Sequence, residues 1–493
     1  MDELIYSEIK QRWQAHSKLP KYRVLYDLLR EMVLSGLLVG GAVLPPSRSL
    51  AKQLKISRNT VNQSYEMLQS DGFLRSQQGS GVFVSEDVVD AQLISAEIEG
   101  EGEGDTPDIS PRVREWVSVR RRHGRVVNAQ PFSTGQPALD EFPFDIWARL
   151  LSRRWRLSGQ ALAVSEDASG YLLLRQHLAA YLQTSRGVKC SPEQIMIVSG
   201  AQQGLDLIAR VLWSEGARVL VEDPAFPGMD GVIRGSGAEL VSAPVDQDGI
   251  LIEGFDNIKS YMVTPSRNYP LGVTMSLARR LNLLKEARRQ QAWIVEDDFD
   301  SEFRFDGPPL SSLQGLDRDG RVIYVGTFSR IIFPALRLGY LVLPQKLVEP
   351  FRVAKSYIDG HASIVHQAAL ADFFEEGYFS SHIRRMKKLY QERRGYLIER
   401  LEAELSEFVK ILPADGGLHL CVVFKVDIDD VAFAAQLEKD GVTLRPLSPF
   451  YRCVAPLRGM VMGFAGFDRE KTDAALQIVK KNLSKLPEFT SIS

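Results

Sequence analysis

From about residue 126 onward, short apolar runs rich in β-branched residues alternate with longer stretches whose apolar residues recur at helical spacing. The short runs include "QIMIVSG", "ARVLVEDP", "SYMVTPS", "AWIVEDD" and "VIYVGTF", and the longer ones include "AQQGLDLIARVLW" and "SLARRLNLLKEARRQ". This alternation predicts a mostly parallel sheet covered by helices. After residue 380, a long charged helical stretch precedes mixed strands and helices. A smaller α+β subdomain is expected there.

The first part of the chain shows a different pattern, typical of small helices. Val61, Tyr65 and Leu68 recur at i, i+4 and i+7, which predicts a helix with one buried face. Ser57 precedes this helix as a suitable N-terminal cap, and Gly72 stands where a helix end commonly takes a left-handed residue. The segment therefore predicts a helix of about three turns with defined ends.

A second short helix is expected just before it, capped by Ser47 and ending near Leu54. After both helices, "FLRSQQGSGVFV" alternates polar and apolar residues around Gly79 and Gly81, as a hairpin does. The order predicts a helix-turn-helix followed by a β-hairpin wing.

Charge divides the chain into the same parts. Residues 1–85 contain eleven Lys and Arg against seven Asp and Glu, whereas residues 86–109 contain nine acidic residues and no basic one. The Glu/Gly-rich composition of the second stretch predicts a linker, and the basic "PRVREWVSVRRRHGR" after it predicts a solvated helix or tether. We expect a winged helix-turn-helix domain at 1–85, a linker at 86–125 and a large domain at 126–493, divided near residue 380.

The chain as a whole gives weaker information. With 493 residues, 44% hydrophobic and 25% charged, it has room for two or three globular domains, and its formal net charge of −2 gives no global argument for nucleic acid or membrane. No signal-type or membrane-spanning apolar run is visible, so a cytoplasmic protein is expected. The three cysteines are widely separated and match no metal-ligand spacing, so no metal site is predicted.

The polar face of the second small helix carries side chains that suit DNA. Arg58 can be bidentate to guanine, Asn59 and Asn62 to adenine, and the helix N-terminus with Ser57 and Thr60 can hold a phosphate. The alternative is a structural helical hairpin whose polar face only meets water. Caps, positive charge and a wing within one short segment favour DNA binding.

This segment also resembles the GntR family of winged helix-turn-helix repressors, through "LPPSRSLAKQLKISRNTVNQSYEMLQSDGFL" and "GSGVFV". The resemblance covers about the first 85 residues, and it implies double-stranded operator DNA as the partner. Taken together, the face and the resemblance predict these DNA contacts: Arg48, Ser57, Arg58, Asn59, Thr60, Asn62 and Gly79.

Several motifs of the large domain suit a phosphorylated aromatic ring. A strand runs through Gly200 into a helix whose amides can bind an anion, Asp297 ends an apolar strand where a protonated pyridine nitrogen needs a carboxylate, and Phe226 offers a stacking surface. Hydroxyl and guanidinium groups for a phosphate come from Thr327, Ser329 and Arg337. Each motif alone has a simpler explanation: an ordinary turn, a solvated acid, a core aromatic, a surface ion pair.

In order and spacing, these motifs resemble a fold-type I aminotransferase over roughly residues 126–480. Joined to a GntR-type module, the chain resembles the MocR/GabR family of transcriptional regulators. The resemblance implies pyridoxal 5'-phosphate as cofactor, a head-to-tail homodimer and a small-molecule effector. It also implies Phe226 over the ring, Asp297 at the ring nitrogen, and these residues around the phosphate: Gly200, Ala201, Gln202, Thr327, Ser329 and Arg337.

Three positions depart from that family pattern. Arg330 stands at the Schiff-base lysine, Phe299 stands at the tyrosine expected beside the ring hydroxyl, and Arg267 with Asn268 replaces the usual His-Gln. A guanidinium stays protonated and delocalised, so it cannot form the Schiff base that a neutral lysine amine forms. No catalytic residue and no transamination are therefore expected.

The leading hypothesis is a dimeric regulator that binds a pyridoxal-phosphate-like ligand non-covalently. The alternative for the ligand site is a pocket that binds nothing and is retained only as part of the fold. One rival is a working aminotransferase with a regulatory module, and another is a ligand-independent dimeric repressor. The arginine that would bind a substrate carboxylate stays open among Arg445, Arg452 and Arg458.

Overall fold

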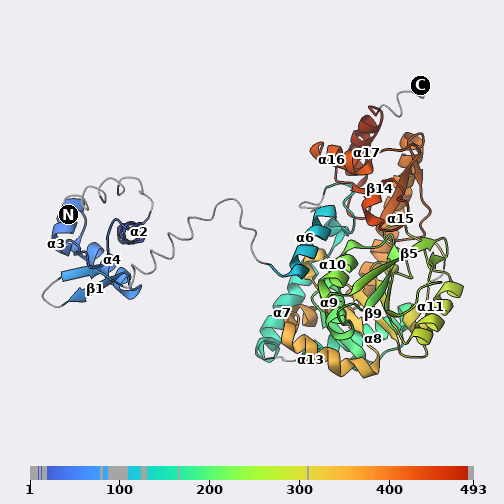
Figure 1. The fold of residues 1–493 in the computed structure, drawn as a ribbon, viewed down its shortest axis with the longest axis horizontal. Coiled ribbons are helices and arrows are strands. Elements are labelled where there is room, and N and C mark those ends of the chain that lie inside the picture. Colours follow the sequence, from blue (N-terminus) through green and yellow to red (C-terminus); the bar gives the residue numbers. More distant parts are fainter. Residues whose placement is uncertain are drawn as a thin grey trace. The chain divides into compact units, whose positions relative to one another are not determined.

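The computed structural model forms two compact units, residues 1–108 and 109–493, and each is described by itself (Figure 1). Described are Ile9 and Trp13, residues 19–77, 81–86, 109–123, 130–164, 167–307 and 310–486, with only the backbone at 118–123. Over these ranges, no helix is both long enough and apolar enough to cross a membrane. The acidic segment 87–108 and Gly79 lie outside the described residues.

The first unit contains the predicted helix-turn-helix and wing. Its elements are α2 (Lys21–Leu34), α3 (Ser47–Leu54), α4 (Arg58–Ser70), β1 (Leu74–Gln77) and β2 (Gly81–Val84). The two strands pair antiparallel as the wing. Val61, Tyr65 and Leu68 are buried on one face of α4, as predicted, and Tyr65 donates its hydroxyl to the Pro45 carbonyl at 2.8 Å.

The caps of the two short helices differ from each other. Ser57 caps α4 by accepting from the Thr60 amide at 3.1 Å, and Gly72 has φ +80°, both as predicted. The prediction that Ser47 caps α3 was wrong: Pro46 occupies the cap position with φ −55°, because its ring fixes that angle, and Ser47 is the first helical residue. The Ser47 hydroxyl instead accepts from Arg58 Nε at 3.3 Å.

An eight-stranded sheet is the centre of the second unit. Its strands are β3 (Ile195–Val198), β4 (Arg218–Asp223), β5 (Glu239–Asp246), β6 (Gly249–Ile250), β7 (Ile258–Val263), β8 (Trp293–Asp298), β9 (Val322–Thr327) and β10 (Gly339–Val342). The order is β3-β10-β9-β8-β7-β4-β5-β6. The pairs among β4, β5, β7, β8 and β9 are parallel, whereas β10 runs antiparallel between β3 and β9.

Helices cover both faces of this sheet. They are α7 (Phe144–Ala163), α8 (Leu172–Arg186), α9 (Ala201–Leu212), α10 (Pro227–Ser236), α11 (Leu277–Gln290), α12 (Leu313–Leu316), α13 (Val348–Ile358) and α14 (Ile364–Glu375). Because strand residues alternate between faces, Val295 of β8 packs in the cluster of α9, α10 and α13, whereas Ile294 packs in that of α11. A sheet buried on both faces explains why its strands read as continuous apolar runs.

A second, antiparallel sheet forms the C-terminal α+β part. It consists of β11 (Val409–Ile411), β12 (His419–Phe424), β13 (Arg445–Pro446) and β14 (Gly459–Gly463), in the order β11-β12-β14-β13, with α15 (Tyr378–Leu405), α16 (Asp430–Lys439) and α17 (Arg469–Leu483). Tyr390, Leu397 and Leu401 of the long helix α15 are buried in the cluster that also contains α8 and α14. The C-terminal part is thus joined to the large sheet by one continuous core.

The basic segment after the acidic linker forms helix α6 (Pro111–His123). A solvated helix or tether was expected, and a helix is present. It also contacts the large unit: the Trp116 indole donates to the Gly231 carbonyl of α10 at 2.5 Å. Periodicity could not show this contact, because it joins segments 115 residues apart.

Candidate functional site

The predicted ligand residues gather at one edge of the large sheet. β3 and β9 flank the reversed strand β10, so both run in the direction of β8, and their carboxyl ends meet at this edge. Asp297 lies at the end of β8, Thr327 ends β9, and Gly200 follows β3 as the cap of α9. Ligands of open α/β sheets bind at such an edge.

The predicted phosphate residues meet around the start of α9. Gly200 has φ +86°, and a Cβ there would lie 3.8 Å from Arg337 Cζ, so the guanidinium stands over the helix N-terminus. A Cβ added at Gly339 would lie 3.0 Å from the Ala201 amide nitrogen. Gly339 of β10 also pairs with Thr327 of β9. The free amides and the guanidinium together suit a dianion.

Gln202 and Phe226 meet at the first turn of α10. Gln202 Nε2 donates to the Gly228 carbonyl at 3.2 Å, and Phe226 is the cap residue of α10. The Phe226 ring lies against Gly228 and makes an edge contact with Tyr269, with ring centroids 6.0 Å apart. The residue predicted beside the phosphate and the one predicted over the ring thus contact the same helix.

The adjacent acids Asp297 and Asp298 have different surroundings. Asp298 forms an ion pair with Arg186 at 2.8 Å and accepts from the hydroxyls of Tyr324 at 2.5 Å and Ser301 at 2.8 Å. Asp297 is 6% exposed, and its Oδ1 has no partner within the described part of the chain. Burial raises the pKa of Asp297 to about 7; the charge of Asp298 adds to the rise, and Arg330 opposes it.

Arg330 lies in the β9–β10 connection. Its guanidinium rests against Gly135, whose φ is +73°, in space that any other side chain at 135 would need. Among the described residues it makes no hydrogen bond or ion pair. Burial lowers the pKa of Arg330, whereas Tyr269, Asp300 and Asp297 favour the charged form. The side chain therefore reaches the acidic side of the site without being neutralised by a direct partner.

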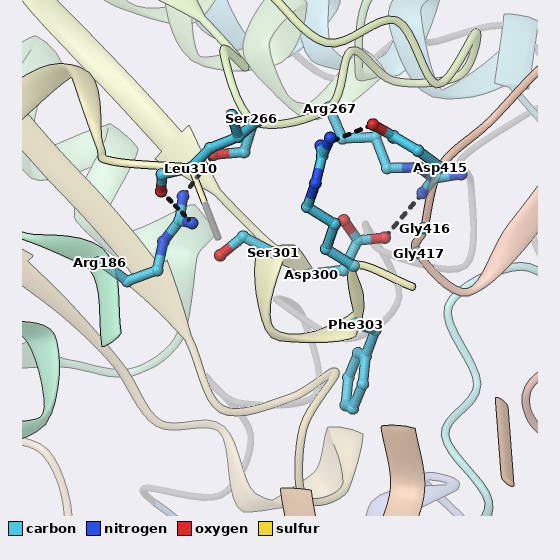
Figure 2. A pocket seen from close by; sticks show the side chains of 11 residues that line it. Arg186, Ser266, Arg267, Asp300, Ser301, Phe303, Leu310, Asp415, Gly416 and Gly417 are labelled. Carbon is cyan, nitrogen blue, oxygen red and sulfur yellow. Dashed lines mark hydrogen bonds and ion pairs between the residues drawn. The ribbon is translucent and has the colours of Figure 1, made fainter. Parts of the chain in front are cut away.

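The departures Arg267 and Asn268 are both engaged in buried contacts. Arg267 bonds Asp300 and the His419 carbonyl, each at 2.8 Å, and Asn268 donates to Glu222 at 3.2 Å. Figure 2 shows Arg267 and Asp300 at one pocket, which also contains the Arg186 guanidinium. None of the predicted cofactor residues lines this pocket. Arg267 therefore joins β12 of the smaller sheet to the acids behind the ligand edge.

The three candidate carboxylate-binding arginines differ in their hydrogen-bonding and ion-pair partners. Arg452 is held by Asp230 and by the Glu222 carbonyl, and the exposed Arg458 pairs with Asp427 at 3.2 Å. Arg445 of β13 has a buried Nε without a partner among the described residues, and its charge acts on Arg330. Of the three, Arg445 is the arginine with a buried guanidinium nitrogen that has no partner among the described residues.

The polar face of α4 is open. Arg48, Arg58 and Asn59 are exposed, whereas Asn62 is half-buried. The hydroxyls of Ser57 and Thr60 contact each other at 2.8 Å within the cap.

Comparison with known proteins covers both units. A model described as bacterial regulatory proteins, gntR family, matches residues 21–84, and one for class I and II aminotransferases matches residues 129–479. The chain is 38% identical over 451 residues to the "Probable rhizopine catabolism regulatory protein MocR" of Rhizobium meliloti, covering 91% of each chain. The chain belongs to the MocR-type transcriptional regulators.

Other relatives match nearly the whole chain or its large unit. The HTH-type pyridoxine biosynthesis transcriptional regulator PdxR of Corynebacterium glutamicum is 29% identical, covering 90% of this chain and 92% of that one. The solved kynurenine aminotransferase of Pyrococcus horikoshii, in complex with PMP, has a TM-score of 0.67 and 26% identity, covering 80% of this chain and 99% of that one. The predicted GntR-type module and fold-type I domain are confirmed.

The site of this MocR-type chain fits a phosphorylated pyridine in two respects. A buried carboxylate oxygen without a partner is what a protonated ring nitrogen needs, and the turn at Gly200 leaves room beside Arg337 that a Cβ would narrow. Asp297 would hold the ring nitrogen, and Gly200, Ala201 and Arg337 the phosphate. When bound, pyridoxal phosphate supplies an aldehyde that amines attack.

Sequence reasoning missed Tyr269 and Gln203. Tyr269 is buried between Phe226, Phe299 and Phe450, with ring centroids 5.4–6.0 Å apart. Gln203 accepts from the Ser199 amide at 2.6 Å and donates to Asp359 at 2.7 Å, which holds the turn before Gly200. Tyr269 follows the unusual Arg-Asn pair, a signal that could have drawn attention to it, whereas Gln203 carried none.

Replacement of Asp297 and of Asp298 by asparagine should change the free energy of unfolding in opposite directions. Because the pKa of Asp297 is raised, ionised Asp297 destabilises the folded state above about pH 7, and this penalty disappears as pH falls toward 4. Asp297→Asn should therefore raise the free energy of unfolding at pH 8 by about 1 kcal/mol or more, with a smaller gain at pH 5. Asp298→Asn should lower it by about 3–5 kcal/mol, because it breaks a buried ion pair.

Urea unfolding of both variants at pH 8 and pH 5 measures these differences. Equal losses in the two variants at pH 8 would show that Asp297 has a partner as strong as Arg186.

Proposed function

We propose that this regulator binds a pyridoxal-phosphate-like ligand without a covalent bond, and that its large unit does not transaminate. The observation that carries the proposal is the unpaired buried Oδ1 of Asp297 in a site where Arg330 stands at the expected lysine position. The ring-nitrogen partner and phosphate residues are retained, whereas the amine is not. The ligand site and the chemistry of turnover are therefore separable in this chain.

Arg330 excludes turnover for a chemical reason. Schiff-base formation needs a neutral amine, and proton movement during transamination needs the same amine afterwards, whereas a guanidinium stays protonated. Lys355 of α13 does not replace it, because it is 1% exposed and its Nζ forms an ion pair with Asp359 at 2.5 Å. Phe299 fits this proposal, since a hydroxyl that tunes the reactive group has no task without an imine.

The ligand we propose carries a carboxylate in addition to its phosphate. Arg330 and Arg445 bring two guanidinium groups to the acidic side of the site, and Arg445 Nε is buried without a hydrogen-bonding partner among the described residues. A carboxylate between them would relieve their mutual repulsion. Pyridoxamine phosphate with a keto acid, or a preformed adduct of the cofactor and an amino acid, has both groups.

The DNA-binding form we propose is a head-to-tail homodimer that places two winged modules on separated half-sites of double-stranded DNA. Large apolar side chains exposed on α7 and α13 support an association surface: Trp155 is 56% exposed, Leu157 77%, Val164 72% and Tyr357 88%. The seven predicted contacts, Gly79 included, belong to this proposal.

Pyridoxamine phosphate, which has no aldehyde, separates binding from imine formation. We expect it to bind the parent protein in calorimetry, and we expect pyridoxal phosphate with borohydride to leave the parent unlabelled. Absence of binding by both compounds would favour the ligand-independent repressor. Covalent labelling of the parent at a lysine would favour the working aminotransferase.

Arg330→Lys restores an amine at the same position. It should bind pyridoxal phosphate covalently, with new visible absorbance and a borohydride-stable mass increase, because the other contacts remain. Arg330→Met, which lacks both amine and charge, is the matched control and should show neither signal. If Arg330→Lys shows neither new absorbance nor a mass increase, residues other than Arg330 also prevent covalent binding of pyridoxal phosphate.

Arg58 tests the recognition helix. If it reads a base through two hydrogen bonds, Arg58→Ala should weaken binding to operator DNA by about 1–3 kcal/mol in a salt-controlled mobility shift. Arg23→Ala on α2 removes an arginine that pairs with Asp27 at 3.3 Å and serves as the control. Equal affinity of Arg58→Ala and the parent for the operator would remove Arg58 from the contact set.

A further inference from the structure

One face of α10 carries three glycines, Gly228, Gly231 and Gly235, at i, i+3 and i+7. Aromatic rings occupy both ends of this face. The Phe226 ring lies against Gly228, and the Trp116 indole covers Gly235 so closely that a Cβ there would overlap it. The proposed ligand site and the docked helix α6 therefore share one surface, two turns apart.

Helix α6 packs along α10 while its described side chains stay largely exposed. Its described side chains, Pro111 to Val117, are exposed or half-buried, and Trp116 itself is 43% exposed. The indole donates to the Gly231 carbonyl, and the nearest ion pair, Glu115 with Arg234, is 4.0 Å long. A 13-residue helix is marginal alone in water, so the helix depends on its docking.

The start of α10 is held by the ligand residues themselves. The Gln202 amide donates to the Gly228 carbonyl at 3.2 Å, and the backbone of Phe226 leads directly into the helix. A phosphate that takes the Gln202 amide removes this bond, and a ring stacked on Phe226 presses on the same turn. The middle of α10 is held separately, because Asp230 accepts a hydrogen bond from Arg452.

We propose that α6 is a ligand-sensitive docking helix, released from the glycine face of α10 when Gln202 and Phe226 engage a ligand. The inference rests on the proposed non-covalent ligand. Because linkage is reciprocal, release of α6 must also tighten ligand binding.

Release changes the reach of the linker. The segment 87–108 joins the first unit to α6, so docked α6 fixes where the linker leaves the large unit. The 13 residues of α6 span about 20 Å as a helix and at most about 45 Å when extended. The difference, at most about 25 Å, is about three quarters of the spacing of about 34 Å between successive turns of DNA, so release of α6 would widen the range of half-site separations that the paired modules can reach.

Hydrogen exchange on the full chain, with and without pyridoxamine phosphate, tests the proposal. We expect amide exchange in α6 to rise several-fold when the compound binds. Trp116→Ala should show the fast exchange without ligand and should bind pyridoxamine phosphate about fivefold more tightly in calorimetry, since release is already complete. Val117→Ala, on a neighbouring face of the same helix and 41% exposed, is the matched control and should behave as the parent.

The outcomes distinguish the two proposals. If the parent does not bind pyridoxamine phosphate, the proposed function fails. Fast α6 exchange in Trp116→Ala would then still show that Trp116 holds α6 on the glycine face of α10. If the compound binds but α6 exchange stays unchanged, the docking helix is not ligand-sensitive and this inference is overturned. Unchanged α6 exchange in Trp116→Ala overturns it in either case.

Discussion

The ion pair between Asp298 and Arg186 determines how the ligand edge is arranged. Successive side chains of a strand point to opposite faces, so fixing Asp298 toward α8 turns Asp297 toward the other side. Tyr324 and Ser301 complete the shell of Asp298, which satisfies that charge within the protein. Asp297 receives no such shell among the described residues, and its buried Oδ1 carries the desolvation cost of a carboxylate oxygen without a partner.

The guanidinium of Arg330 changes the charge distribution around Asp297. In an enzyme of this fold the amine reacts and then carries protons, whereas Arg330 brings a permanent positive charge close to Asp297, Asp300 and Arg445. The acids favour the guanidinium, and Arg445 opposes it. The ligand that we propose, with a phosphate, a carboxylate and a pyridinium, would complement these charges of both signs.

Much of this architecture could be predicted from the sequence, because the signals are local. The helical spacing of Val61, Tyr65 and Leu68 and the alternation of strands and helices gave the correct elements, and motif order brought the ligand residues to one edge. The contacts of Arg267 with β12 and of Trp116 with α10 could not be predicted, since they join segments that no periodicity relates. Ser47 failed as a cap because Pro46 held that position.

The reversed strand β10 has a consequence for how this chain departs from enzymes of the same fold. Because β10 pairs antiparallel with β9, the connection between Thr327 and Gly339 is a hairpin loop closed at both ends by sheet hydrogen bonds. Arg330 lies inside that loop, and its guanidinium packs against Gly135. The residue at this position is therefore presented by a loop rather than by a sheet strand, so its identity is separate from the apolar alternation that builds the sheet.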